Sequence, residues 1–260
     1  MSCDTYSQFT CITSDYDGGM ESVLAIAALG TATLSGVFGM AGGLLLFGVY
    51  TAILPVATAV VVHSGTQLLS NVSRVAVQRR WVMSGPVAWF AVGALAVYAA
   101  FSWWVPRLEP APLFTVLGAS VLGSFLVPQF AWMDASRPRG AALAGAVTTA
   151  AQLTGGVGGP LMDVFWVGVE ADRRAVVATK ALTQALAHVL RIAFWAPLVV
   201  GIDLETGALL GIAAGTMVGT LLGSLILDRL GEREFRRWTR GIVVLLGLGY
   251  LGRGLSLWVA

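Results

Sequence analysis

Charged residues are scarce in this sequence. Only 12% of its 260 residues are charged and 57% are hydrophobic, with a mean hydropathy of +0.79, whereas about 25% of the residues in soluble domains are charged. This composition excludes an ordinary soluble domain. The net charge of +2 is also too small to indicate a nucleic-acid partner. The sequence therefore predicts an all-α integral membrane protein that contacts membrane lipid along most of its length.

Nucleotide-binding and catalytic motifs are lacking as well. The chain contains no phosphate-binding P-loop, no H-E-x-x-H metal motif and no nucleophile elbow. ATP-driven pumping by this chain alone is thereby excluded, which leaves an ion or proton gradient as the source of energy. We accordingly expect no enzymatic activity, no catalytic residue, no bound metal and no cofactor.

Cysteine occurs only twice, at Cys3 and Cys11, in a polar N-terminal segment at residues 1–19. The segment lacks the basic stretch and the following apolar run that mark a cleaved signal peptide. The two cysteines pair if the segment faces an oxidising compartment, and they stay free thiols otherwise. Their C-x7-C spacing alone is weak evidence for metal binding.

Long apolar stretches fill the rest of the chain. About 20 helical residues cross a hydrocarbon core of about 30 Å. Two stretches are longer than one crossing needs, and glycines interrupt each near its middle, as SGVFGMAGG in the first and TGGVGGP in the second. The apolar segments are residues 20–54, 56–77, 84–105, 112–131, 141–169, 175–200, 206–227 and 241–260.

The sequence repeats itself. TQLLSNVSRVA at residues 66–76 matches TQALAHVLRIA at residues 183–193 at six of eleven positions, 117 residues later. The same offset, without a gap, lays Gly39 on Gly156 and Gly42 on Gly159. We therefore expect two transmembrane repeats, at residues 20–131 and 141–260, joined by a cytoplasmic linker at residues 132–140.

Basic residues mark alternate connections, which predicts the topology. Placing all the basic connections in the cytoplasm requires both long segments to return to the side from which they started. Each repeat is then a glycine-broken helical hairpin followed by three transmembrane helices, the two repeats are inverted, and both termini are extracytoplasmic. The alternative is that each long segment is one tilted span and the repeats are parallel. The basic residues are Arg79, Arg80, Arg137, Arg139, Arg173, Arg174, Arg229, Arg233, Arg236, Arg237 and Arg240.

Polar residues form one stripe on a helix of each repeat. Helical spacing places four polar side chains on one face in each case. Because charge inside a membrane is costly, both stripes are expected to face protein or a water-filled cavity. The first stripe is His63, Gln67, Ser70 and Arg74, and the second is Lys180, Gln184, His188 and Arg191.

Position along the two helices suggests different roles for these side chains. Gln67 and Gln184 lie near the helix centres and are the expected substrate ligands. Arg74 and Arg191 lie near opposite ends, where they attract anions at the two mouths of a pathway. The alternative for both arginines is that their side chains extend to the lipid headgroups.

The glycine breaks supply a second expected element of the site. A broken membrane helix frees backbone N–H groups, and its positive end attracts an anion. The alternative is that these glycines only allow close helix packing. The predicted cradle consists of Gly39, Gly42, Gly43, Gly156, Gly158 and Gly159.

Four ionisable groups remain inside the apolar segments. His63 and His188 titrate nearest neutral pH and are candidates for a proton relay, or else are hydrogen-bonded core residues. Asp163 is expected to pair with Lys180, because an unpaired charge in lipid is costly. Together with Ser70 and the arginines, these groups are predicted to line the pathway or to balance substrate charge.

At these residues the chain resembles the TauE/SafE family of sulfite and organosulfonate exporters, also called TSUP permeases. The resemblance spans about residues 20–258. It implies secondary transport of sulfite, sulfoacetate or another sulfonate, commonly outward across a bacterial inner membrane. It rests on Gly36, Gly39, Gly42, Gly43, Leu54-Pro55, Arg74, Arg79-Arg80, TGGVGGP at residues 154–160 and Thr183-Gln184.

Two departures make the repeats asymmetric. Asn71 of the first repeat corresponds to His188, and Gly43 corresponds to Pro160. The sequence predicts a multi-pass transporter of a small sulfur-containing anion, driven by protons or membrane potential and working by alternating access. The alternatives are a passive anion channel and a membrane-embedded thiol relay or enzyme that uses Cys3 and Cys11.

Overall fold

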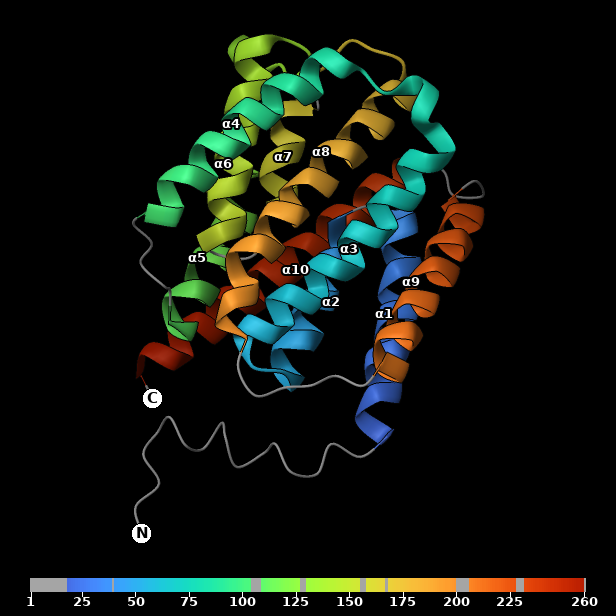
Figure 1. Cartoon of the computed structure of the whole chain (residues 1–260), viewed down its shortest axis with the longest axis vertical. Helices are drawn as coiled ribbons and strands as arrows, with labels where there is room; N and C mark the ends of the chain where they lie inside the picture. The colour runs from blue at the N-terminus through green and yellow to red at the C-terminus, as the bar shows by residue number, and fades with distance from the viewer. Residues whose placement is uncertain are drawn as a thin grey trace.

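The computed structural model describes residues 18–38, 40–103, 109–126, 130–154, 158–166, 168–199, 206–227 and 232–259, which contain helices and no strand. The α-helices are α1 (Gly18–Phe38), α2 (Met40–Ile53), α3 (Val56–Gln78), α4 (Ser84–Trp103), α5 (Pro110–Gly123), α6 (Pro138–Thr154), α7 (Gly159–Trp166), α8 (Arg173–Trp195), α9 (Thr206–Leu227) and α10 (Glu232–Val259). The short 3-10 helices are η1 (Arg79–Trp81), η2 (Ala131–Met133) and η3 (Ala196–Leu198). Figure 1 shows them as one bundle.

Three helices in the described part are long and apolar enough to cross a membrane: Ser84–Trp103, Thr206–Gly223 and Arg240–Val259. They leave large apolar side chains exposed, among them Val92, Leu210 and Leu245, as expected of a surface that faces lipid. α3 and α8 have 23 residues each. They are long enough to span but more polar, and they pack against each other.

Both long apolar segments are broken where the glycines predicted. Residues 20–54 form α1 and α2, and residues 141–169 form α6 and α7. In Figure 1, α2 runs back toward the end where α1 began, and α7 runs back beside α6. Gly39 and Gly156 lie outside the described residues. The breaks matter because they place the start of a short helix inside the bundle.

Two predicted boundaries were wrong. α5 ends at Gly123, well before residue 131, and is followed by a turn. α10 begins at Glu232, so that residues 232–240, expected in a connection, are helical. Hydropathy marks the part of a helix that suits lipid, whereas Glu and Arg are good helix formers that extend the helix beyond it.

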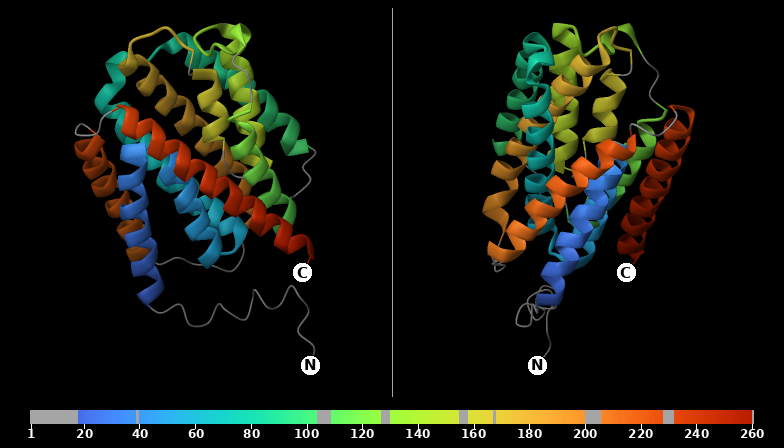
Figure 2. Two further views of the ribbon diagram at one scale, coloured as in Figure 1. Left: turned by 180° about the vertical axis from the view of Figure 1, so that it is seen from behind. Right: turned by 90° about the vertical axis from the view of Figure 1, so that its right-hand side faces the viewer.

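The helices pack in four main pairs: α1 with α9, α6 with α4, α3 with α8, and α5 with α10. Adding 117 to the first and last residue numbers of α3 and η1 gives the first and last residue numbers of α8 and η3. The same offset places α1 on α6 and α4 on α9. The α1–α9 pair of helices therefore corresponds to the α6–α4 pair, with the two repeats exchanged. Figure 1 shows α3 and α8 running in opposite directions, and the view from behind in Figure 2 shows α10 crossing α2 toward α5.

Glycines bring the backbones of these pairs close together. A Cβ atom at Gly93 of α4 would collide with the carbonyl oxygen of Ala142 in α6, and one at Gly145 of α6 would collide with that of Phe90. At the α1–α9 crossing, a Cβ at Gly215 would lie 2.7 Å from the Ala25 oxygen. Small residues at such crossings allow the dispersion contacts that hold membrane helices together.

Replacing Gly93 by alanine is therefore expected to destabilise the protein by about 3 kcal/mol, because α4 and α6 must move apart. Gly85→Ala is the matched control, since it lies in the same helix and its Cβ would meet no atom within 4 Å. Thermal unfolding in detergent measures both. Equal melting temperatures for the two variants would contradict the close α4–α6 crossing.

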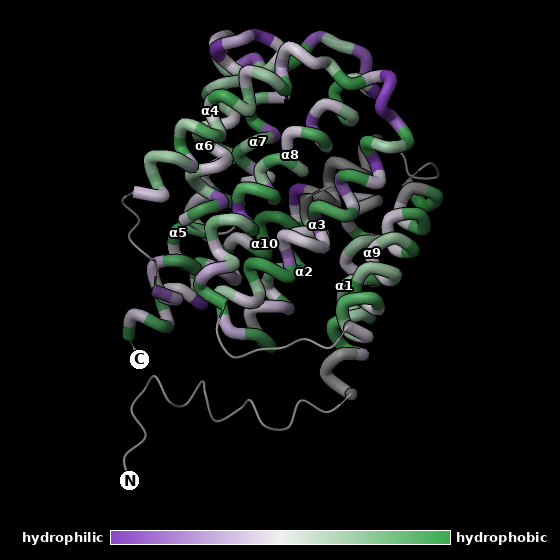
Figure 3. The backbone as a smooth tube through the Cα atoms, in the orientation of Figure 1, coloured by the Kyte–Doolittle hydropathy of each residue, from purple (hydrophilic) through white to green (hydrophobic). Residues whose placement is uncertain are grey.

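Hydrophilic residues gather at the end of the bundle where α3 ends and α8 begins (Figure 3). There the guanidinium groups of Arg80 and Arg174 each lie 5.5 Å from the centroid of the Trp81 ring. Since Arg80 follows α3 and Arg174 begins α8, this stacking fixes both basic connections at one end. This arrangement is consistent with the prediction that the basic connections lie on one side of the membrane.

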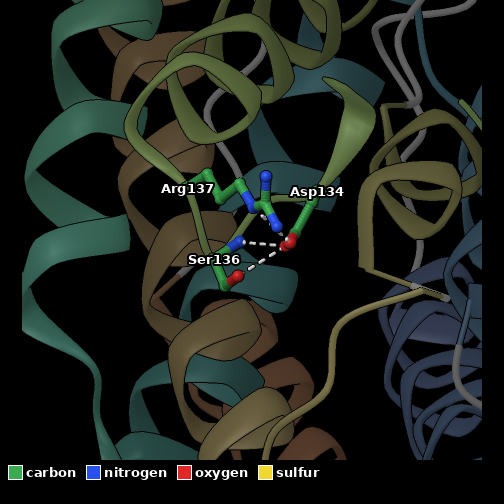
Figure 4. Close-up of polar contacts among 3 residues, drawn as sticks. All are labelled: Asp134, Ser136 and Arg137. Carbon is green, nitrogen blue, oxygen red and sulfur yellow. Dashed lines mark hydrogen bonds and ion pairs between the residues drawn. The ribbon is translucent and has the colours of Figure 1, made fainter. Parts of the chain in front are cut away.

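The turn that leads into α6 is a second polar structure (Figure 4). The Asp134 carboxylate accepts hydrogen bonds from the Ser136 backbone N–H at 2.8 Å and from its hydroxyl at 2.5 Å. Arg137 forms an ion pair with the same carboxylate at 3.2 Å. These contacts fix the chain direction just before Pro138 starts the helix.

Candidate functional site: a buried polar centre between α3 and α8

Both predicted stripes face the interior of the bundle, as expected. His63, Ser70, His188 and Arg191 are buried, and Arg191 has no exposed surface. The other four members, Gln67, Arg74, Lys180 and Gln184, are half-buried. The antiparallel packing of α3 on α8 brings the two stripes together from the two halves of the chain.

The centre of one half is the guanidinium group of Arg191. Its Nη1 lies 3.2 Å from Nδ1 of His63, and its Cζ lies 5.1 Å from the centroid of the Phe47 ring in α2. Because arginine only donates, Nδ1 of His63 accepts. Nε2 then carries the proton and donates to the Gly43 carbonyl oxygen at 3.0 Å. Both ring nitrogens are used, so His63 is neutral and holds Arg191 in place.

The expected location of Arg191 was wrong. The sequence placed it at the outer mouth, or extended to the headgroups, but it is fully buried against α3 and α2. Helical side chains point back toward the N-terminus of their helix. Since α8 runs toward its last turn at Trp195, the long side chain of Arg191 points back into the bundle.

Two aromatic residues complete this cluster, and the sequence analysis missed both. The Tyr250 hydroxyl in α10 donates to the Leu44 carbonyl oxygen, and its ring lies 6.3 Å from that of Phe47. Phe47 also packs edge-on against His63, with 5.3 Å between centroids. An aromatic residue in an apolar segment gives no sequence signal that separates it from ordinary core.

The other half contains the predicted ion pair. Lys180 Nζ contacts the Asp163 carboxylate of α7, which confirms the expected pairing. Lys180 corresponds to His63 when the repeats are aligned by 117 residues. In each repeat, this position of the long helix (α3 or α8) therefore contacts the preceding short helix (α2 or α7). Arg74 lies within electrostatic range of Lys180, as its counterpart Arg191 lies beside His63.

The two short helices begin at the middle of the two long ones. A Cβ atom at Gly43, in the first turn of α2, would lie 2.9 Å from Nε2 of Gln67. In the second half, the Thr183 hydroxyl lies 3.7 Å from the sulfur of Met162, in the first turn of α7. Gln67 and Gln184 make no side-chain hydrogen bond within the described ranges, so both amides remain available for a ligand.

The predicted glycines differ in their surroundings. A Cβ atom at Gly42 would collide with the Thr31 carbonyl oxygen of α1, and one at Gly158 would lie 2.7 Å from that of Thr148 in α6. Close packing of the two helices within each hairpin therefore accounts for glycine at these two positions. Gly43 faces the polar centre, and Gly159 is the half-buried first residue of α7.

The remaining candidates lie at the edge of the centre. The Ser70 hydroxyl hydrogen-bonds that of Thr220 in α9 at 3.2 Å, so it ties α3 to α9. The His188 ring lies 6.0 Å from His63, and its Nδ1 is buried without a hydrogen-bond partner in the described part of the chain. Of the two histidines, only His188 therefore keeps a ring nitrogen for a proton or a ligand.

A cavity of about 610 Å³ lies between α2, α5 and α10. Tyr250 and Arg253 are among its lining residues. Through Tyr250, the cavity adjoins the Phe47 and Arg191 cluster. It lies toward the end of the bundle where α2 ends and α10 approaches its C-terminus.

Comparison with known proteins gives one match. The sequence model of the family described as "Sulfite exporter TauE/SafE" matches residues 24–250. No curated protein and no solved structure matches the chain. The matched range includes both stripes, both short helices and Tyr250.

Proposed function

The chain belongs to the sulfite exporter TauE/SafE family, and from this premise we propose that it is a secondary active transporter of a small sulfur-containing anion. Sulfite or an organosulfonate such as sulfoacetate is the substrate class, and export is the direction. The observation that carries the proposal is Arg191, a fully buried cation with no ion-pair partner among the described residues. A buried charge needs a counter-charge, which an anionic substrate supplies.

The two repeats are inverted in this proposal. Three features support it: the exchange of partners between α1–α9 and α6–α4, the opposite directions of α3 and α8, and the position of the basic connections at one end. Inverted repeats with broken helices allow alternating access, in which the halves rock around a site near the bilayer midplane.

The substrate lies between the first turns of α2 and α7. Gln67 and Gln184 contribute amide groups there, and Gly43 lets the backbone approach. The proposed anion cradle also includes Gly42, Gly158 and Gly159, together with Gly39 and Gly156, which lie outside the described residues. Further ionisable residues line the pathway or balance charge around this site: Arg74, Asp163, Lys180, His188 and Arg191.

Energy comes from the proton gradient or the membrane potential. His188 is the group proposed to exchange a proton, because both ring nitrogens of His63 already form hydrogen bonds. The protein lies in the bacterial inner membrane with its basic end in the cytoplasm and both termini outside.

A flux assay in reconstituted vesicles tests the function. The substrates are sulfite, sulfate, sulfoacetate, taurine and a simple carboxylate, each with and without a pH gradient. Saturable transport of sulfite or a sulfonate that responds to the gradient is the expected result. Flux that is linear in concentration and insensitive to both gradients would instead identify a passive channel. Flux that is lost on replacing both Cys3 and Cys11, which lie outside the described residues, would favour a thiol relay.

Membrane topology is tested by cysteine labelling. In a background without native cysteines, a cysteine at Ser136 is expected to react only from the cytoplasm, and one at Glu109 only from outside. Both positions are exposed and lie on opposite connections of the bundle. Impermeant maleimide applied to intact cells and to inverted vesicles gives the measurement. Labelling of both positions from the same side would rule out the proposed orientation.

A further inference from the structure

Two nitrogen atoms of Arg191 have no hydrogen-bond acceptor among the described residues. The side chain is fully buried, and only Nη1 has a partner, Nδ1 of His63. Nε and Nη2 have no hydrogen-bond partner in the described part of the chain. A buried donor without an acceptor is costly, and more so when it is charged, so these N–H groups require an acceptor from elsewhere.

The two unused nitrogens lie on the same edge of the guanidinium plane. Nε–H and one N–H of Nη2 point in the same direction and form a two-pronged donor. Two oxygens on one central atom match that edge, as in a sulfite, sulfonate or carboxylate group. A chloride ion or a linear thiocyanate ion has no such pair of oxygens.

The neighbours of Arg191 hold this edge in a fixed direction. His63 accepts from the opposite side of the guanidinium and is itself held by the Gly43 carbonyl oxygen. Phe47 covers one face, and Tyr250 packs against Phe47. A rigid donor edge loses little conformational freedom when an anion binds.

The two halves differ in how their charged groups are paired and buried. In the second repeat, Asp163 neutralises Lys180. The position that corresponds to Asp163 in the first repeat is Leu46, and His63 is neutral. The fully buried Arg191 cluster therefore carries one positive charge without an ion-pair partner among the described residues, whereas the Lys180–Asp163 pair is neutral and the added positive charge beside it belongs to the half-buried Arg74.

We propose that the Nε–Nη2 edge of Arg191 binds the oxyanion group of the substrate side-on, through two of its oxygens, and selects a singly charged anion. This assignment rests on the proposed function and deepens it. It makes the site asymmetric: the first-repeat cluster around His63 and Phe47 positions the ligand, and the Lys180–Asp163 pair is not its counterpart. Hydrogensulfite and monosulfonates fit this site better than sulfate.

Equilibrium binding to the purified protein in detergent tests the assignment, with methanesulfonate, hydrogensulfite, sulfate and thiocyanate as probes. Arg191→Lys keeps the charge but removes the two-pronged edge, so affinity for methanesulfonate is expected to fall on the order of 100-fold. Affinity for thiocyanate should change by less than about 3-fold, because the remaining point charge suffices for it. Arg240→Lys is the matched control, since that arginine also lies over a phenylalanine ring, 5.8 Å from Phe125, but at an exposed position.

His63→Leu provides a second variant in case Arg191→Lys does not fold. It keeps the guanidinium and removes the acceptor that orients it, so methanesulfonate affinity is expected to fall about 10-fold. Unchanged methanesulfonate affinity in the folded Arg191→Lys protein, or in His63→Leu when Arg191→Lys does not fold, would overturn the assignment. So would equal losses for methanesulfonate and thiocyanate. Measuring flux in vesicles separates the two proposals. If binding depends on Arg191 but the wild-type protein gives no flux, the proposed transport function is refuted and this inference stands. If the wild-type protein gives normal flux but binding does not depend on Arg191, this inference is refuted and the transport function stands.

Discussion

Replacing Gln67 by alanine is expected to abolish measurable transport while the protein still inserts and folds. The Gln67 amide lies at the middle of α3, against Gly43 in the first turn of α2, and donates to no described protein acceptor. A hydrogen bond to a charged group contributes about 1.5–3 kcal/mol. Its loss at the point where the ligand is held corresponds to roughly a 10- to 100-fold loss of affinity.

The same result is expected for Gln184→Ala, because Gln184 is the repeat counterpart of Gln67. Gln78→Ala is the control, since Gln78 is the last residue of α3 and lies away from the centre. Vesicle flux measured beside a folding check by size exclusion gives the comparison. Normal flux in either central variant would remove that glutamine from the site, and loss in only one would confine the ligand contact to one repeat.

Replacing Asp163 by leucine is expected to destabilise the protein by about 3 kcal/mol. The change removes the counter-charge of Lys180 and leaves a cation inside the bundle. Both side chains keep about a quarter of their surface exposed, 25% for Lys180 and 26% for Asp163, which places the expected cost at the low end of the range for buried pairs. Arg74 adds repulsion, since it lies within electrostatic range of Lys180.

The double variant Asp163→Leu with Lys180→Met is expected to recover most of that loss, because no unpaired charge remains. Arg137→Met is the matched control, as it breaks an ion pair whose arginine is 74% exposed and should cost less than about 1 kcal/mol. Denaturant unfolding in mixed micelles measures all three proteins. A double variant no more stable than Asp163→Leu would show that the pair contributes by packing rather than by charge.

The Arg191 cluster indicates which basic residue is placed to contact an anion. Membership of the TauE/SafE family accounts for anion transport, but the family match alone does not choose among the basic residues. Burial, hydrogen bonding and charge balance make that choice. They leave Arg191 as a fully buried cation whose Nε and Nη2 groups have no hydrogen-bond partner, and whose charge has no ion-pair partner, among the described residues.

Several features could be predicted from the sequence because each depends on local order. Low charge and long apolar runs predict membrane helices, and glycine clusters predict where two of them break. The Thr-Gln repeat predicts two similar halves, and helical spacing predicts which polar residues share a face. The pairing of Asp163 with Lys180 followed from the cost of an isolated charge, and the structure confirms the contact.

The sequence by itself determined the class of protein, the broken helices and the faces that carry the polar residues, because these follow from composition and from a period of 3.6 residues. Only the tertiary structure decided what those faces meet. The antiparallel packing of α3 on α8 brings Arg191 to His63 across 128 positions of the chain, and α10 adds Tyr250 from further away still. No periodicity within one helix encodes such contacts, because they depend on how whole helices cross and on which way a long side chain points.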